Sequence, residues 1–125
     1  MPIILVVDDE KPVRRFLVAA LEQEGYEVIE AGHGAHALNL INSGSKRPDL
    51  VISDVMMPLV GGVELCKILK SNPSTANIPI VLMSAAHARA STGAGADAII
   101  GKPFDLDALE ALVRRLLIAA RTSTS

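Results

Sequence analysis

The stretch Ile3-Ile4-Leu5-Val6-Val7-Asp8-Asp9 joins five apolar, mostly β-branched residues to two acidic ones. An apolar run without alternation is typical of a strand buried on both faces, as in a parallel sheet covered by helices. Leu50–Ser53, closed by Asp54, and Ile78–Met83, closed by Ser84, have the same character. Polar residues therefore stand where buried strands end.

Around these runs, the sequence predicts five strands that alternate with five helices. Apolar residues at intervals of three and four indicate the helices, and glycine or proline marks several of their ends. Strands are expected at Ile3–Val7, Tyr26–Glu30 (an edge strand), Leu50–Ser53, Ile78–Met83 and Asp97–Gly101. Helices are expected from Pro12 to a stop at Gly25, and over Gly34–Ser43, Val63–Lys70, Ala85–Gly95 (weakly periodic) and Asp105–Arg121. Strict alternation predicts an α/β fold: a doubly wound five-stranded parallel sheet covered on both faces.

Two of these helices have a clear apolar face, and the last has a candidate cap. The first helix is expected to bury Val13, Phe16, Leu17, Ala20 and Leu21. The last helix is expected to begin at the cap Asp105 and to bury Leu106, Leu109, Leu112, Val113 and Leu116.

The composition excludes several classes of protein. Half of the 125 residues are hydrophobic and 21% are charged, which predicts one domain with a packed core. Three aromatic residues and a net charge of −2 argue against nucleic-acid binding and against an anionic membrane surface. No apolar run approaches the ~20 residues of a membrane span. The single cysteine, Cys66, fits a reducing compartment, so we expect a cytoplasmic protein.

Five residues at strand ends could form one site. Asp8 and Asp9 follow the first strand, Asp54 the third, Ser84 the fourth and Lys102 the fifth. If the strand order is 2-1-3-4-5, these ends meet at the crevice where ligands bind in open parallel sheets. Three carboxylates in such close proximity repel one another unless a cation lies among them. A site with oxygen ligands alone suits Mg²⁺. The ammonium and the hydroxyl could bind a phosphoryl group, and a carboxylate there could be the nucleophile that forms an acyl phosphate.

From about residue 3 to 120, the sequence resembles the receiver domain of two-component response regulators. The resemblance is carried by Val6-Val7-Asp8-Asp9-Glu10, Asp54-Val55-Met56-Met57-Pro58 with Gly62, Met83-Ser84-Ala85, Ala94-Gly95-Ala96-Asp97 and Gly101-Lys102-Pro103-Phe104. It implies a flavodoxin-like (βα)5 fold with strand order 2-1-3-4-5. Residues 1–121 would form the receiver domain, and residues 122–125 a frayed tail.

The resemblance also implies a phosphoacceptor and a metal site. Asp54 would take a phosphoryl group from a sensor histidine kinase or a histidine phosphotransfer protein. Mg²⁺, or Mn²⁺ in its place, would be bound directly by Asp9, by Asp8 mostly through a water, by Asp54 and by the backbone carbonyl of Met56. Such a domain is not an enzyme, although it can catalyse its own phosphorylation and dephosphorylation. It signals by protein–protein contact with an output partner.

The remaining implied roles lie at the ends of the fourth and fifth strands. Lys102 would pair with the phosphoryl group, and Ser84, with Ala85 beside it, would move toward that group as the switch hydroxyl. The Lys102–Pro103 peptide would be cis, as X–Pro bonds sometimes are.

Two departures from the family pattern concern the readout of phosphorylation. Ile99 stands where family members usually carry Tyr or Phe. The stretch from Ser84 to Lys102 is about four residues shorter than usual, which is about one helical turn. With few large apolar residues, Ala85–Gly95 is expected to be locally mobile. An atypical or vestigial coupling of phosphorylation to output is therefore an alternative.

Other readings of the acidic residues remain open. Asp8 and Asp9 could simply cap the first helix. An aspartyl-phosphate phosphatase of the haloacid dehalogenase type would need a second Asp two residues after Asp54, where this chain has Met56. A nucleotide-binding fold would need a glycine-rich first turn, which the Asp8–Pro12 segment lacks.

The other chemically suggestive residues have simpler interpretations. The three histidines have Gly and Ala neighbours and are expected in loops or on the surface: His33, His36 and His87. Cys66 lies in an apolar helical stretch and is expected to be a core residue. The pairs Arg14-Arg15 and Arg114-Arg115 are expected on solvated helix faces.

Overall fold

A computed structural model describes residues 1–44, 46–57, 59–84, 95–102 and 104–123. Five parallel strands form one sheet in the order β2-β1-β3-β4-β5, which confirms the predicted fold class and strand order. The strands are β1 (Ile3–Val7), β2 (Glu27–Ala31), β3 (Leu50–Asp54), β4 (Ile80–Ser84) and β5 (Ala98–Gly101). The order reverses between β1 and β3, so the crevice for a ligand is expected at their carboxyl ends.

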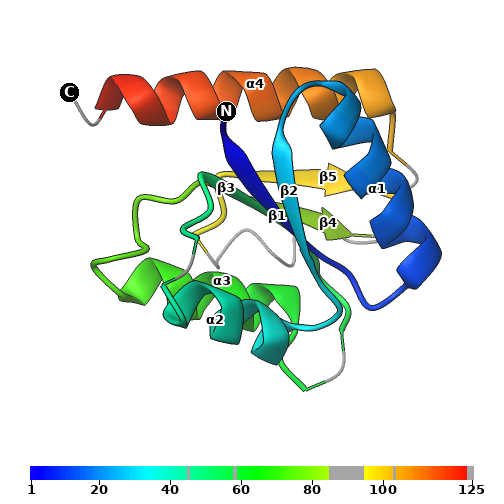
Figure 1. The fold of residues 1–125 in the computed structure, drawn as a ribbon. Coiled ribbons are helices and arrows are strands. Elements are labelled where there is room, and N and C mark those ends of the chain that lie inside the picture. The colour runs from blue at the N-terminus through cyan, green and yellow to red at the C-terminus, as the bar shows by residue number, and fades with distance from the viewer. Residues whose placement is uncertain (45, 58, 85–94, 103, 124–125) are drawn as a thin grey trace.

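The described part of the chain holds four helices. They are α1 (Lys11–Gln23), α2 (Gly34–Asn42), α3 (Gly62–Ser71) and α4 (Leu106–Ser123). In Figure 1, α1 and α4 cover one face of the sheet, and α2 and α3 cover the other. The expected helix at Ala85–Gly95 lies outside the described residues, except for Gly95. Helix α4 continues to Ser123, two residues into the expected tail. None of the described helices is long and apolar enough to cross a membrane.

Two apolar layers hold the helices to the sheet, because successive residues of a strand point to opposite faces. Under α1 and α4 lie the buried residues Ile4, Val6, Leu17, Leu21, Leu50, Ile52, Val81, Met83, Leu109, Val113 and Leu117. Under α2 and α3 lie Leu5, Val7, Ala31, Ala37, Val51, Leu65, Cys66, Leu69, Ile78, Ile80 and Leu82. Strands β1, β3 and β4 contribute to both layers, which explains their unbroken apolar sequences. The sheet is therefore fixed from both sides, and its strand ends are held in place.

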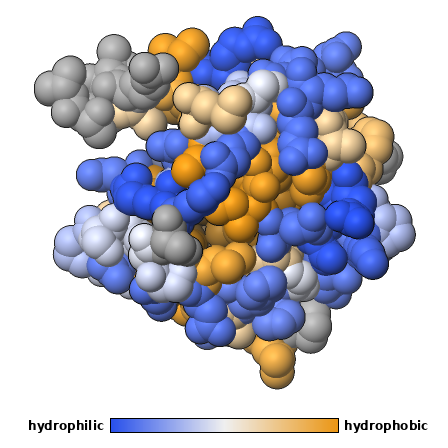
Figure 2. All heavy atoms as spheres, in the orientation of Figure 1, coloured by the Kyte–Doolittle hydropathy of each residue, from blue (hydrophilic) through white to orange (hydrophobic). Residues whose placement is uncertain are grey.

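Strand β2 is the edge strand that the mixed sequence predicted. Most of its residues are only partly buried, and it pairs with β1 alone. Figure 2 shows hydrophilic residues over most of this side of the molecule, with apolar residues gathered near the middle, where β2 crosses in Figure 1.

Two sequence expectations about packing need correction. Strand β4 begins at Ile80, two residues later than predicted, because Pro79 has no N–H to donate to a ladder. Phe16 is 55% exposed, so the prediction that it lies on the buried face of α1 is wrong. Leu17 and Leu21, one turn apart, point into the core. Phe16 is rotated by about 100° from Leu17 around the helix axis, and its side chain is largely exposed to solvent.

Candidate functional site

Three of the predicted site residues meet at the carboxyl edge of the sheet. Asp8 directly follows β1, Asp54 is the last residue of β3, and Lys102 directly follows β5. The ammonium Nζ of Lys102 lies 3.3 Å from Asp8 Oδ2 and 3.2 Å from Asp54 Oδ1. Both aspartates are buried, and the lysine side chain is mostly buried. The structure thus builds one charged cluster from three strand ends.

Asp8 is held by bonds to four other parts of the chain. Its N–H donates to the carbonyl of Ala31 at 3.2 Å. Its Oδ1 accepts from the Glu10 N–H at 2.9 Å, and its backbone carbonyl accepts from Arg14 Nη1 at 2.8 Å. Its Oδ2 faces Lys102. The capping alternative for Asp8 accounts only for the bond from Glu10, since Glu10 is itself the N-cap residue of α1.

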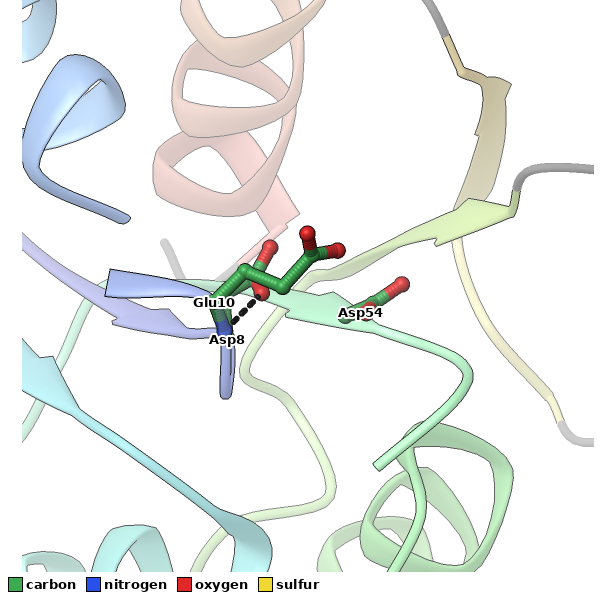
Figure 3. Close-up of side chains that lie close together, drawn as sticks. All are labelled: Asp8, Glu10 and Asp54. Carbon is green, nitrogen blue, oxygen red and sulfur yellow. Dashed lines mark hydrogen bonds between the residues drawn. The ribbon is translucent and has the colours of Figure 1, made fainter. Parts of the chain in front are cut away.

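A third carboxylate, that of Glu10, joins the two aspartates. Asp8, Glu10 and Asp54 each offer one oxygen, and these oxygens all lie within 4.8 Å of one another. Figure 3 shows the Glu10 side chain reaching from the loop after β1 toward Asp54. The sequence interpretation gave Glu10 no role, although it adjoins the acidic pair. Asp9, the predicted direct ligand, is exposed and is not a member of this three-residue cluster.

The electrostatics of the cluster are unbalanced. Burial raises the pKa of Asp54, Lys102 opposes this shift, and the charges of Asp8 and Asp9 add to it. Burial alone would lower the pKa of Lys102, but the carboxylates of Asp8 and Asp54 together outweigh it and raise that pKa. One ammonium therefore opposes two buried aspartates with Glu10 beside them, and a set of oxygen ligands alone suits a hard divalent cation.

The loop after β3 depends on a glycine for its course. A Cβ on Gly62 would lie 2.2 Å from the Asp54 carbonyl oxygen, so only glycine allows α3 to begin this close to Asp54. The Gly62 N–H donates to the Val55 carbonyl at 3.0 Å and closes the loop. Leu59 has φ of +66°, a conformation that side chains rarely adopt. The Met56 side chain is 76% exposed, and its backbone carbonyl remains a predicted ligand.

The predicted switch residues lie beside the cluster on neighbouring strands. Ser84 ends β4 and is buried, and its carbonyl accepts from the Lys102 N–H at 2.8 Å. Ile99 pairs with Leu82 in the register of β4 and β5 and packs against the layer under α2 and α3. Ala85, Pro103 and therefore the predicted cis peptide lie outside the described residues.

The structural roles predicted for two histidines, Cys66 and Asp105 are confirmed. His33 and His36 are exposed, and His33 Nδ1 accepts from the His36 N–H as the cap of α2. Cys66 is fully buried, and burial raises the pKa of its thiol. Asp105 Oδ1 accepts from the Asp107 N–H at the start of α4. His87 lies outside the described residues.

The prediction that Arg14 lies on a solvated face is wrong. Its side chain is 16% exposed, and Nε donates to Glu30 Oε1 at 2.8 Å. The hydrogen bond from Arg14 lowers the pKa of the Glu30 carboxyl. Arg15 is 63% exposed, as expected, and contacts the same glutamate at 3.4 Å. No local pattern signalled the difference between the two arginines, since the partner Glu30 lies on strand β2.

The chain matches a family model and many curated proteins. The response regulator receiver domain model matches residues 4–114. Response regulator MprA of Mycolicibacterium vanbaalenii is 43% identical over 122 residues, which is 94% of this chain and 51% of that protein. A probable transcriptional regulatory protein of Picosynechococcus is 41% identical over 91% of this chain and 48% of its own length. The chain thus spans about half the length of these relatives.

Solved structures agree with the fold. The receiver domain of a signal transduction histidine kinase from Syntrophus aciditrophicus superposes with a TM-score of 0.88 and 33% identity, covering 95% of this chain and 92% of that one. Response regulator TrrA from Thermotoga maritima, solved in complex with Mg²⁺ and BeF, gives a TM-score of 0.83 and 38% identity. That match covers 93% of this chain and 99% of the TrrA chain.

Proposed function

Because the chain belongs to the response regulator receiver family, we propose that it accepts a phosphoryl group on Asp54 and signals by protein–protein contact. The donor is a phosphohistidine on a sensor kinase or a phosphotransfer protein. The observation that carries the proposal is the setting of Asp54: a buried carboxylate at a strand end, 3.2 Å from the Lys102 ammonium and beside Asp8.

In the transfer, a carboxylate oxygen of Asp54 attacks phosphorus. An O–P bond forms while the P–N bond to the donor imidazole breaks, and the bonding electron pair leaves with the nitrogen. Negative charge spreads over the phosphoryl oxygens in the transition state. Lys102 already lies between Asp8 and Asp54, so its ammonium can pair with one of those oxygens without a long movement.

The donor set fits Mg²⁺, with Mn²⁺ as a substitute. The three clustered residues offer only carboxylate oxygens, and Lys102 balances just one of their charges. Asp8, Asp9 and Asp54 would hold the ion with the Met56 carbonyl, and Glu10 lies within reach of the same set. When bound, the ion supplies positive charge to the phosphoryl oxygens. The complex of the relative TrrA with Mg²⁺ and BeF supports this assignment.

The readout is assigned to the neighbouring strands. The Ser84 hydroxyl donates a hydrogen bond to the phosphoryl group. Ile99 favours an unusual coupling, since an aliphatic side chain packed beside Leu82 cannot move as an aromatic ring does. A partner protein or an attached domain would read the change. A phosphatase of the haloacid dehalogenase type has less support, because Met56 supplies no second acid.

The test is phosphorylation by a small donor. The parent protein, incubated with acetyl phosphate and Mg²⁺, should gain one phosphoryl group by intact mass, and a chelator should suppress the gain. Asp54→Asn should gain none. Asp97→Asn is the matched control, since Asp97 is also an aspartate paired with a lysine, 2.9 Å from Lys70 Nζ. Equal labelling of Asp54→Asn and the parent would refute the assignment.

A further inference from the structure

We propose that Arg14, oriented by Glu30, is a positioning residue for the acidic loop after β1, so that affinity for Mg²⁺ depends on a pair that need not touch the ion. The inference rests on the proposed function, because the role is defined toward that cation.

Arg14 joins three segments of the chain. Its backbone lies in the first turn of α1, and its Nε donates to Glu30 Oε1 of β2 at 2.8 Å. Its Nη1 donates to the backbone carbonyl of Asp8 at 2.8 Å. The edge strand thus orients the guanidinium, and the guanidinium holds the loop. With only 16% of its side chain exposed, Arg14 meets little competition from water for these bonds.

The carbonyl that Arg14 binds controls two candidate ligands at once. The carbonyl carbon of Asp8 and the nitrogen of Asp9 belong to one planar peptide unit, so fixing the oxygen of Asp8 also fixes the start of Asp9. The next N–H, that of Glu10, donates back to Asp8 Oδ1 at 2.9 Å. Arg14 therefore restrains the directions in which the side chains of Asp8 and Asp9 leave the backbone, and the bond from Glu10 to Asp8 links the third acidic residue to them.

The geometry requires a guanidinium rather than any cation. The guanidinium is planar and rigid, and its Nε and Nη1 groups donate in different directions. Here Nε donates to the carboxylate of Glu30 and Nη1 donates to the backbone carbonyl of Asp8. A lysine in this position would keep the charge but could not hold both acceptors in one fixed orientation.

A purely electrostatic role predicts the opposite sign. Arg14 is a positive charge bonded to the loop that would bind the cation, so Coulomb repulsion alone means that its removal tightens Mg²⁺ binding. Positioning means that its removal weakens binding, because the ligands lose their arrangement before the ion arrives.

Arg15 offers a matched control. It neighbours Arg14 on the same helix and contacts the same Glu30, at 3.4 Å. Its side chain is 63% exposed, and no contact described for it reaches the acidic loop.

The first measurement is the Kd for Mg²⁺ by calorimetry at constant ionic strength. We expect Arg14→Met and Arg14→Lys to weaken binding about tenfold, as outer-shell substitutions commonly do. Glu30→Gln should also weaken Mg²⁺ binding, and Arg15→Met should leave the Kd unchanged. Binding by Arg14→Lys and Arg14→Met equal to or tighter than the parent would overturn the proposal.

The second measurement needs no metal and separates the two proposals. Amide exchange of Asp9 and Glu10, normalised to unfolding stability in urea, should be faster in Arg14→Lys and Arg14→Met but not in Arg15→Met. If the parent protein binds no Mg²⁺, the proposed function fails. If, in addition, amide exchange of Asp9 and Glu10 is the same in the parent and the Arg14 variants, the positioning role is refuted as well. If the parent binds Mg²⁺ and exchange is unchanged, only the positioning role falls.

Discussion

Two lysines of this molecule face carboxylates at opposite ends of the strands. Lys70 lies at the amino ends and Lys102 at the carboxyl ends, and their surroundings differ. Lys70, at the end of α3, donates to the carbonyls of Ala76 and Ile78 at 3.2 and 2.9 Å and to Asp97 Oδ2 at 2.9 Å. The same carboxylate oxygen accepts the Ile80 N–H at 2.8 Å, where β4 begins. Lys102, at the carboxyl edge, instead faces Asp8 and Asp54.

The difference lies in charge balance. Asp97 opposes Lys70 one to one, and backbone carbonyls occupy the remaining donors of the lysine, so this cluster needs nothing from outside. At the carboxyl edge, Lys102 opposes two buried aspartates, and Glu10 lies beside them. The Lys70–Asp97 pair is balanced in charge and joins elements of the fold. The cluster around Lys102 has an excess of negative charge, which a bound cation would neutralise.

Binding of Mg²⁺ should stabilise the folded protein strongly. At a concentration about a hundred times its Kd, the ion should add about 2.7 kcal/mol to the free energy of unfolding, because it binds only the folded state. Asp54→Asn should lose most of this gain, and Asp97→Asn should keep it. Urea unfolding with and without MgCl₂ measures both. An equal gain in unfolding free energy in the parent and in Asp54→Asn would mean that Mg²⁺ binds at another site.

Without metal, the same two substitutions should have opposite signs. Asp54→Asn should raise the free energy of unfolding, because burial raises the pKa of Asp54 despite Lys102 and its charge therefore destabilises the metal-free fold. Asp97→Asn should lower it by about 1 kcal/mol, because Lys70 loses its ion-pair partner. Thermal unfolding in a chelator gives both values. Destabilisation by both substitutions would erase the distinction between the two edges.

The advantage of Asp54→Asn should also depend on pH. Burial raises the pKa of Asp54, so the folded protein binds this proton at pH values where the unfolded chain has released it. The metal-free parent therefore loses stability, relative to Asp54→Asn, as pH rises from the usual value of about 4 through the raised pKa. Unfolding of both proteins across this range checks the sign. A difference that grows toward acid pH would contradict it.

The smallest expected effect concerns output. With beryllofluoride as a phosphoryl mimic, NMR shifts should be large at Ser84 and Lys102 and small at Ile99 and along α4. A ligand shifts an equilibrium only as far as the two states interact with it differently, and Ile99 offers no ring to move. Amides around Lys70 serve as the unaffected reference. Large shifts spread over Ile99 and α4 would show ordinary coupling.

The fold and the centre of the site could be predicted from the sequence because both depend on strand ends. Unbroken apolar runs identify buried strands, and the polar residue after each run must then lie at one edge. Asp8, Asp54 and Lys102 follow this rule, although 46 and 48 positions separate consecutive members.

The residues that sequence reasoning missed depend on contacts between segments. Arg14 and Arg15 look alike in the sequence, and only the distance to Glu30 on the edge strand distinguishes them. Whether Glu10 or Asp9 turns toward Asp54 depends on how the loop leaves β1. The bonds of Lys70 likewise depend on where the turn before β4 brings its carbonyls.

The ion pair between Lys102 and Asp8 also bears on the order of folding, since it joins residues 94 positions apart. A chain that had assembled β1, β3 and β4 without β5 would bury two aspartates with no ammonium to oppose them, which costs free energy. Such a partly folded state is disfavoured, and contacts this distant in sequence carry a large entropic cost of loop closure. The residue after the last strand therefore supplies the ammonium that opposes the aspartates of the first and third strands, and the domain should fold as one cooperative unit.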